Sequence, residues 1–258
     1  MKLLLEALAA GSIILGSCAS TQRQQAEIRA LEEIVDDYQR GKELKNKAEE
    51  NPAQRQEYYE SAANAFYTAM LKRNNTYEAT IEYADCLSQS GDFRQALEWI
   101  DKALYLQKTD KAFDAKGIIC SRKGFISFAE ECFTNAIAIK DTAQYRWHRF
   151  QTRLKTAQTE DNYLDKALED IKKVTEQRPN EPEGYIFTAS VYGIMLFTRQ
   201  DKTCAKDVYD SLKKAFELID AGNKTKFSMF ELNELRTVYN ALKKRYEPIK
   251  TVFEEENY

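Results

Sequence analysis

Glycine and proline are scarce in this chain of 258 residues, which contains 9 Gly and 4 Pro. Together they make up about 5% of the chain, against about 12% in an average protein. β-Sandwiches and β-barrels need many turns rich in Gly and Pro, so this scarcity excludes both classes. It also excludes collagen-like chains and Pro/Gly-rich disordered chains. The composition therefore predicts an all-α protein.

A surplus of basic residues is also missing. The chain has 38 Lys and Arg against 41 Asp and Glu, which gives a formal net charge of -3. Nucleic-acid binders usually show a basic surplus or a basic stripe, and neither is present. We therefore predict no nucleic-acid partner.

Residue patterns that carry catalysis are absent as well. The only histidine is His148, and the sequence contains no His-Glu-x-x-His, Cys-x-x-Cys or Gly-Lys-Ser/Thr motif. A Cys–His nucleophile would have to pair His148 with Cys120 or another thiol, and packing explains both positions. Carboxylate pairs such as Glu130-Glu131 are usually solvated faces of amphipathic helices. We therefore expect no enzyme activity, no metal and no cofactor.

The first residues have the pattern of an export signal. Lys2 precedes an apolar stretch that ends at Leu15, which is shorter than the about 20 residues needed to span a bilayer. The stretch ends in Leu15-Gly16-Ser17-Cys18, which resembles the lipobox of bacterial lipoproteins. Glu6 departs from the pattern because it places a charge in the apolar region. A buried N-terminal helix and a non-lipidated signal are the alternatives.

The lipobox resemblance implies how this end of the protein is processed. A signal peptide over 1–17 would be removed, Cys18 would carry the lipid, and residues 18–22 would form a short tether. After Cys18 there is neither an Asp at the second mature position nor an acidic cluster. This favours a lipid-anchored protein of the bacterial cell envelope, at the outer membrane and facing the periplasm.

Two segments of the chain repeat one pattern when they are aligned on their glycines. The matched pairs are Gly91 with Gly124, Ala96 with Ala129, Ile100 with Phe133, and Ala103 with Ala136. A small residue also lies seven positions before each glycine, at Ala84 and Gly117. This pattern resembles the tetratricopeptide repeat (TPR), a helix–turn–helix unit of 34 residues.

The TPR resemblance implies a right-handed helical solenoid with four to five repeats and a capping helix. A generic helical bundle is the alternative, and a coiled coil is the alternative for the first helix near 23–47. We expect a single solenoid domain over 23–258. Its predicted repeats are 23–76, 77–109, 110–143, 144–181 and 182–222, followed by a cap and tail over 223–258.

The predicted capping helix begins at a capping box, Ser228-Met-Phe-Glu231, and ends near Tyr246. Its spacing predicts an apolar side that packs on the solenoid. That side consists of Phe230, Leu235, Val238, Tyr239 and Leu242.

Four cysteines follow Cys18, at positions 86, 120, 132 and 204. Three of them fall inside predicted helices next to core positions, where Cys behaves as a small hydrophobe. We favour buried thiols, while a disulfide stays open because the predicted compartment oxidises thiols.

The remaining candidate for function is a surface. In TPR proteins the inner, concave face is built mainly by the first helix of each repeat. Carrying the repeat positions over gives Ile81, Asp85, Ser88, Asp114, Ile118, Ser121, Tyr145, His148, Thr152, Ile186 and Ser190, with Arg122 beside them. These types do not match the Lys and Asn clamp that some TPRs use for a terminal carboxylate. They suit an extended peptide or a helix laid in the groove.

The resemblance therefore implies a non-enzymatic, lipid-anchored scaffold that binds proteins or peptides of the cell envelope. The alternative is a lipoprotein that captures glycans or peptides for nutrient uptake. Proteins of that class carry large ligand-binding insertions, whereas the insertions here, near 156–162 and 199–203, have only a few residues.

Overall fold

The structure is a computed structural model that describes residues 37–73, 77–157 and 162–246. These ranges consist of helices and turns and contain no strand. The predicted all-α class is thereby confirmed for these ranges. The predicted signal peptide, the lipidated Cys18 and the tether over 18–22 lie outside the described residues.

The chain divides into two compact units, Met1–Gln107 and Lys108–Tyr258. We describe each by itself, as the N-terminal unit and the C-terminal unit. The single solenoid domain expected over 23–258 stays a prediction.

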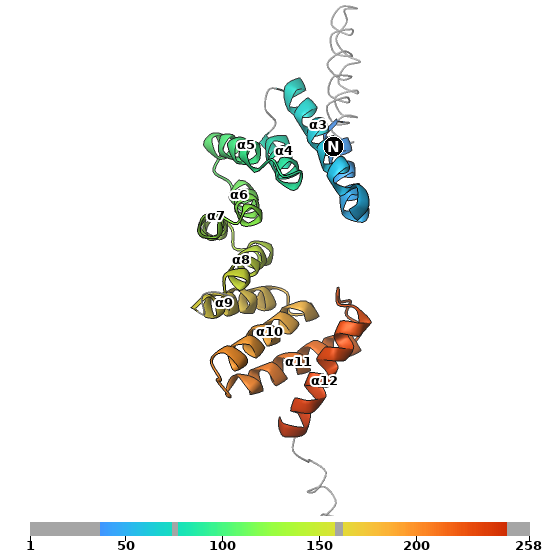
Figure 1. The fold of residues 1–258 in the computed structure, drawn as a ribbon, viewed down its shortest axis with the longest axis vertical. Helices are drawn as coiled ribbons and strands as arrows, with labels where there is room; N and C mark the ends of the chain where they lie inside the picture. Colours follow the sequence, from blue (N-terminus) through green and yellow to red (C-terminus); the bar gives the residue numbers. More distant parts are fainter. Residues whose placement is uncertain (1–36, 74–76, 158–161, 247–258) are drawn as a thin grey trace, which may run out of the picture. The chain divides into compact units, whose positions relative to one another are not determined.

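In the described part of the N-terminal unit, residues 37–50 are helical. The elements that follow are η1 (Pro52–Gln54), α3 (Arg55–Arg73), α4 (Tyr77–Gln89) and α5 (Phe93–Leu106). Within this unit α3 packs against α4, and α4 packs against α5 (Figure 1).

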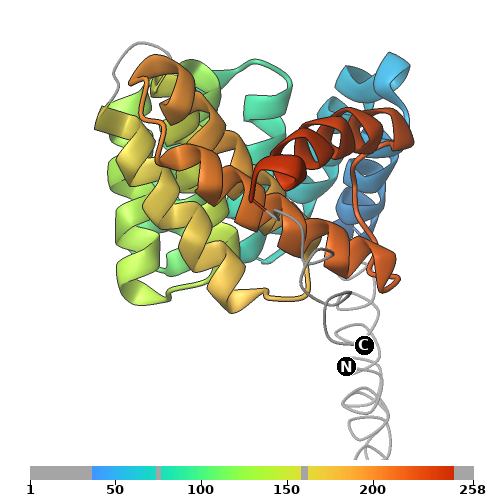
Figure 2. The same cartoon turned by 90° about the horizontal axis from the view of Figure 1, so that it is seen from below.

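The C-terminal unit continues the helix–turn–helix pattern. Its helices are α6 (Asp110–Lys123), α7 (Ile126–Ile139), α8 (Ala143–Thr156), α9 (Asn162–Gln177), α10 (Pro182–Thr198), α11 (Cys204–Asp220) and α12 (Met229–Tyr246). Each packs against the next in sequence, and Figure 2 shows α8 to α11 side by side. One helix pair lies in each predicted segment from 77–109 to 182–222, with α12 after the last.

The aligned glycines adopt the same backbone conformation. Gly91 and Gly124 have φ angles of 91° and 88°, which place both in the left-handed region that favours glycine. At the end of α6 the Phe125 N–H donates to the Cys120 carbonyl at 2.8 Å, which closes the helix terminus. The repeated glycine thus marks the point where each first helix turns into its partner.

The repeated small residues lie where helices cross. Ala96, Ala129 and Ala136 have no exposed surface. A Cβ added at Gly117 would lie 2.6 Å from Cε1 of Phe133, so α6 and α7 approach closely only because position 117 has no side chain. Small residues at these positions let paired helices come into contact, as the repeat pattern predicts.

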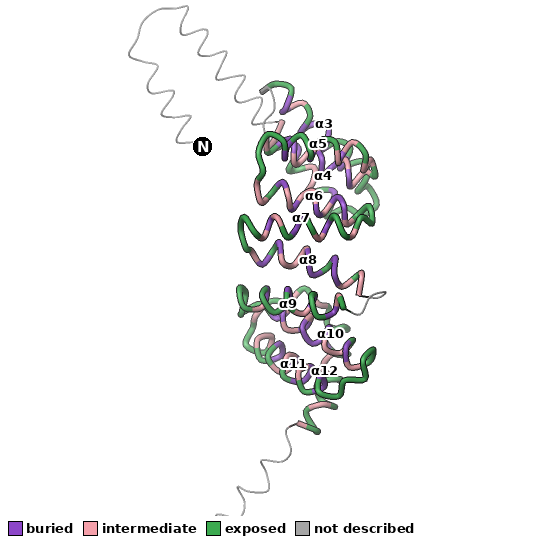
Figure 3. Tube along the Cα trace, turned by 90° about the vertical axis from the view of Figure 1, so that its left-hand side faces the viewer, coloured by how far each residue is buried: buried purple, intermediate pink, exposed green. Residues whose placement is uncertain are grey.

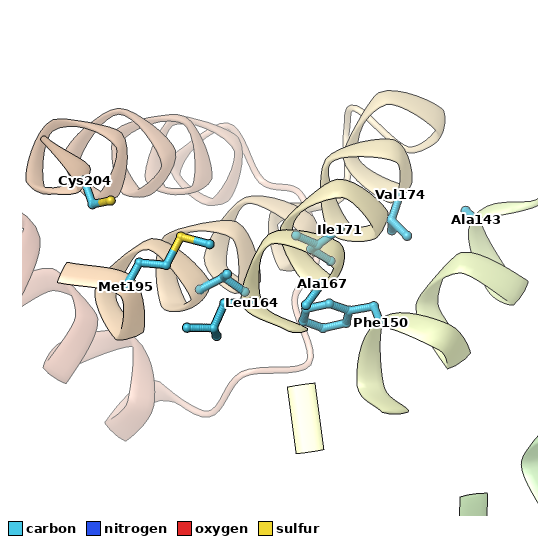
Figure 4. Close-up of a cluster of buried hydrophobic side chains, with 9 residues drawn as sticks. Ala143, Phe150, Leu164, Ala167, Ile171, Val174, Met195 and Cys204 are labelled. Carbon is cyan, nitrogen blue, oxygen red and sulfur yellow. The ribbon is translucent and has the colours of Figure 1, made fainter. Parts of the chain in front are cut away.

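The largest apolar cluster of the C-terminal unit joins α8, α9, α10 and α11 (Figure 4). It includes Phe150 of α8, Leu164 and Ile171 of α9, and Met195 of α10, all buried. In Figure 3 the colouring by burial shows that buried positions alternate with exposed ones along the helices. Each helix therefore buries one stripe against its neighbours and leaves the other to solvent.

The four cysteines at 86, 120, 132 and 204 are all buried thiols, as favoured from the sequence. A hydrogen bond with Cys120 and burial raise the pKa of Cys132, so its thiol stays protonated. A buried, protonated thiol is a poor nucleophile.

The capping box is confirmed. The backbone N–H of Ser228 donates to Oε2 of Glu231 at 2.8 Å, and the Glu231 N–H donates back to Oγ of Ser228 at 3.3 Å. The predicted apolar side of α12 is wrong in part. Phe230 is 71% exposed and Val238 is also exposed, whereas Leu232 is the buried residue of this helix. Leu235, Tyr239 and Leu242 do pack on the core, as predicted.

Candidate functional site

Helix α8 presents two different faces in the C-terminal unit. Residues Gln144, Trp147 and His148, three and four positions apart, line a groove. The three arginines at 146, 149 and 153 share another face and contact carboxylates of neighbouring elements. One face of α8 therefore borders the groove, while the other contacts carboxylates within the protein.

The main groove has a volume of about 800 Å³. Its walls come from α8, the end of α9, the start of α10, the segment 224–227 and the start of α12. The lining residues are Gln144, Trp147, His148, Val174, Arg178, Glu181, Glu183, Gly184, Phe187, Lys224, Thr225, Lys226, Phe227 and Glu231. We call this cavity the main groove throughout.

A row of three aromatic rings runs along the main groove. The ring centroids of Trp147 and Phe187 are 4.8 Å apart with an interplanar angle of 72°, and those of Phe187 and Phe227 are 5.6 Å apart. Such tilted and edge-to-face contacts fix the rings relative to one another. The row comes from three separate elements, α8, α10 and the segment before α12.

Each carboxylate of the main groove accepts a hydrogen bond from the protein. Arg178 Nη1 donates to Glu181 at 3.3 Å, and the Lys226 backbone N–H donates to Glu183 at 2.7 Å. The Ser228 N–H and hydroxyl donate to Glu231, and these bonds lower the pKa of the Glu231 carboxyl. No ion pair to Lys224 or Lys226 occurs within the described ranges.

A smaller cavity of about 260 Å³ is also lined by His148. Its lining residues are Ile118, Ser121, Arg122, Phe133, His148, Gln151, Thr152 and Lys155. Five of these, Ile118, Ser121, Arg122, His148 and Thr152, belong to the predicted concave face. The structure thus brings the predicted residues of α6 and α8 together, with His148 bordering both cavities.

Other residues of the predicted face are bound within the protein. His148 Nδ1 lies 2.8 Å from Oδ1 of Asp114, which is itself buried. The buried Tyr145 donates its hydroxyl to Asp110 at 2.9 Å. Burial and that hydrogen bond raise the pKa of Tyr145, so its phenol stays neutral. Asp114 and Tyr145 therefore position α8 against α6 rather than face a partner.

The prediction for the fifth repeat is wrong in part. Ile186 is 2% exposed and packs against Ala215 and Leu232, so it is not open to a partner. Ser190 is exposed and donates its hydroxyl to the Ile186 carbonyl at 2.9 Å. On α10 the groove is lined instead by Glu183, Gly184 and Phe187.

Three predicted residues belong to the N-terminal unit. Ile81 and Asp85 are half-buried, and Ser88 is buried. Asp85 and Glu82 both accept hydrogen bonds from Lys45, at 2.7 and 2.6 Å. Burial works against the charge of Lys45, but the two carboxylates raise its pKa, so it stays protonated. One concave wall joining these residues to those of the C-terminal unit stays a prediction.

A buried ionic cluster was missed by sequence reasoning. Asp170 of α9 has no exposed surface, and it accepts hydrogen bonds from Arg149 at 2.7 and 3.0 Å. Arg153 donates to it at 2.8 Å and Arg146 at 3.3 Å. A carboxylate within the apolar stripe of α9 was the signal that could have revealed it. The cluster joins α8 to α9 and does not border either cavity.

In the part of the chain that the structure describes, no group of three or more His, Cys, Asp or Glu residues could hold a metal ion. None of its helices is long and apolar enough to cross a membrane.

Comparison with known proteins identifies the fold. No protein-family model matches the chain, and no curated protein matches it either. Solved structures do match. A crystal structure of MamA protein, at 16% identity, matches 76% of this chain and 97% of its own, with a TM-score of 0.54. MamA 41-end from Desulfovibrio magneticus RS-1, at 18% identity, matches 72% and 98%, with a TM-score of 0.51.

YrrB, described as a TPR protein with an unusual peptide-binding site, matches 64% of this chain and 79% of its own at 16% identity, with a TM-score of 0.47. The chain has the TPR-type fold. Because the identities are below 25%, the likeness to the two MamA structures shows the fold and not what the chain binds.

Proposed function

We propose that this chain is a non-enzymatic scaffold of the bacterial cell envelope that binds a protein or peptide partner in its main groove. The observation that carries the proposal is the row of aromatic rings, Trp147, Phe187 and Phe227, along a groove of about 800 Å³. Aromatic side chains in central, well-packed positions carry much of the energy of protein interfaces. TPR-type solenoids offer such a groove without any catalytic group.

The size and chemistry of the groove support a peptide ligand. Its volume falls within the roughly 300–1,000 Å³ of typical ligand sites. The aromatic row offers a surface for apolar side chains, while Gln144 and Arg178 supply donors for a peptide backbone. An extended peptide uses both kinds of contact at once.

The location rests on the sequence of the N-terminus. We propose that Cys18 is lipidated and holds the protein at the outer membrane, facing the periplasm. Each buried CH₂ of the acyl chains contributes about 0.8 kcal/mol, and several chains together make such anchoring stable. The partner is then a protein or peptide of the same compartment.

The test is crosslinking in cells, followed by mass spectrometry of the captured proteins. Gln144→Trp should narrow the main groove and strongly reduce the crosslinked partner, because position 144 is exposed and lines the groove. Lys173→Trp on the exposed face of α9 is the matched control and should keep the partner. If both variants keep it, the main groove is not the binding site.

A ligand-capture protein is the second candidate. Aromatic rings beside carboxylates, as with Phe187 and Glu183, also suit sugars. Glycan binding that Gln144→Trp abolishes, with no protein captured by crosslinking, would place the chain in this class.

A further inference from the structure

Unpaired positive charge lies at one edge of the main groove. Lys224 and Lys226 both line it, and within the described ranges neither lysine has an ion-pair partner. The carboxylates of Glu181, Glu183 and Glu231, in contrast, already accept hydrogen bonds from the protein. This edge next to Phe227 therefore suits a ligand that brings carboxylates beside an apolar side chain.

The chain itself contains a segment of that chemistry. Residues 252–258 read Val-Phe-Glu-Glu-Glu-Asn-Tyr. The segment offers an aliphatic and an aromatic side chain, followed directly by three carboxylates. Val252 and Phe253 match the apolar character of the aromatic row, and the three glutamates match the charge of Lys224 and Lys226.

The segment can also reach the groove. Helix α12 ends at Tyr246, and Glu231 in its first turn lines the groove. At about 1.5 Å per residue, the helix axis between Glu231 and Tyr246 is about 22 Å long. An extended chain spans about 3.3 Å per residue, so Phe253 can lie about 23 Å from Tyr246. Fully extended and running back along α12, the segment is just long enough to bring Phe253 level with Glu231 at the groove.

We propose that residues 252–258 dock in the main groove of the same chain, with Phe253 on the aromatic row and the three glutamates at Lys224 and Lys226. The inference rests on the main groove being a peptide-binding surface, as proposed above. The segment then acts as an internal competitor that an envelope partner must displace. It makes access to the groove depend on the affinity of the partner.

A single tryptophan reports on the groove. The chain has 2 Trp, and Trp99→Phe leaves Trp147 of the groove as the only one. In this background we expect acrylamide to quench the fluorescence of Trp147 less in the full chain than in a chain that ends at Tyr246. In the Phe253→Ser variant, and in the double variant Lys224→Glu with Lys226→Glu, the fluorescence of Trp147 should be quenched as strongly as in the shorter chain.

A charge exchange tests the docking contact. The replacement of Glu254, Glu255 and Glu256 by Lys should restore the protection of Trp147 from acrylamide only when it is combined with Lys224→Glu and Lys226→Glu. Lys202→Glu with Lys206→Glu makes the same change of charge on exposed residues outside the groove, and it should leave quenching as in the full chain. Circular dichroism should show the same helix content in all variants.

A peptide of sequence 247–258 measures the competition. A segment tethered this closely has an effective concentration near 1 mM, so a site of about 0.1 mM affinity would be about 90% occupied. The peptide should then bind the full chain about tenfold more weakly than the chain ending at Tyr246. Equal affinity for both chains, or equal quenching, would overturn the proposal.

Protection that rises with protein concentration would also overturn it, because the occupant would then be a second copy. The outcome is separable from that of the proposed function. If the chain ending at Tyr246 still captures its partner in cells while no docking is seen, only the internal competitor fails.

Discussion

Asp170 offers the sharpest test of how the C-terminal unit is held together. Its carboxylate is fully buried and accepts two hydrogen bonds from Arg149, at 2.7 and 3.0 Å. Replacing it by Asn removes the charge and turns one acceptor into a donor that faces a guanidinium. Arg149 would then keep its 2.9 Å hydrogen bond to Thr134 and one bond to the remaining side-chain oxygen, but it would have no carboxylate partner.

The magnitude follows from what each arginine retains. Arg153 keeps Glu130 at 2.7 Å, and Arg146 keeps Asp141 at 2.6 Å, so only Arg149 is left without a carboxylate. Removing one partner of a buried ion pair costs about 3–5 kcal/mol. Because two of the three arginines keep a partner, we expect Asp170→Asn to lower the free energy of unfolding by about 3 kcal/mol.

The assay is thermal and urea unfolding followed by circular dichroism. A loss of about 3 kcal/mol corresponds to a melting temperature about 6–12 °C lower for a chain of this size. The matched control is Asp165→Asn, which breaks the 2.8 Å pair with Arg199; the Asp165 side chain is 65% exposed. Exposed pairs contribute about 0–1 kcal/mol. Melting temperatures within about 2 °C of each other would refute this reasoning about the buried cluster.

Three further predictions follow from the helix contacts, the N-terminus and the salt bridges. Ala129→Phe overpacks a fully buried crossing and should cost about 1–3 kcal/mol or more in unfolding experiments, whereas exposed Glu131→Ala should stay within about 0.5 kcal/mol. Equal stability of the two would argue against the packing register. Cys18→Ser should release the protein into the soluble fraction and remove the acylated N-terminal peptide from mass spectra; unchanged membrane attachment speaks against lipidation. A hydrogen bond from Arg146 lowers the pKa of Asp141 below its ordinary 3.8, so this carboxylate stabilises the fold above about pH 4 and stops doing so as pH falls through the lowered value. Asp141→Asn should therefore reduce the loss of unfolding free energy at acidic pH. An unchanged pH dependence would show that the Asp141–Arg146 pair contributes nothing.

The helix pairs of this fold are predictable because the repeated glycines and alanines lie at turns and at helix contacts. Gly91 and Gly124 recur because each ends a first helix in a left-handed conformation. Ala96 and Ala129 recur because two backbones cross there, and Gly117 has no side chain because the Phe133 ring occupies that space. Contacts of this kind require the same type of residue at the same repeat position, and an alignment of the repeats therefore reveals them.

The lining of the main groove was predicted less well because it depends on how each helix is rotated. The groove side of α8 is built by Gln144, Trp147 and His148, whereas the repeat positions indicated Tyr145, His148 and Thr152. A shift of one residue turns a side chain by about 100° around the helix, which is enough to bury Tyr145 instead of exposing it.

Two other features lay outside what the repeat could indicate. The segment carrying Lys224, Lys226 and Phe227 follows the last repeat, so no repeat position predicts that it closes the groove. Glu130 belongs to a carboxylate pair that was expected on a solvated helix face. It binds Arg153 at 2.7 Å and is half-buried, because α8 brings an arginine next to it. That contact joins residues far apart in sequence, and for this reason Glu131 is the better control.

The most direct test of the central claim, a partner held in the main groove, is site-specific photocrosslinking in cells. A photoreactive amino acid would be placed at Gln144 in the groove and, in a second strain, at Lys173 on the outer side of α9. We predict one discrete protein adduct from position 144 and none from position 173. An adduct from position 173 with none from position 144 would contradict the account, because the partner would then bind outside the groove.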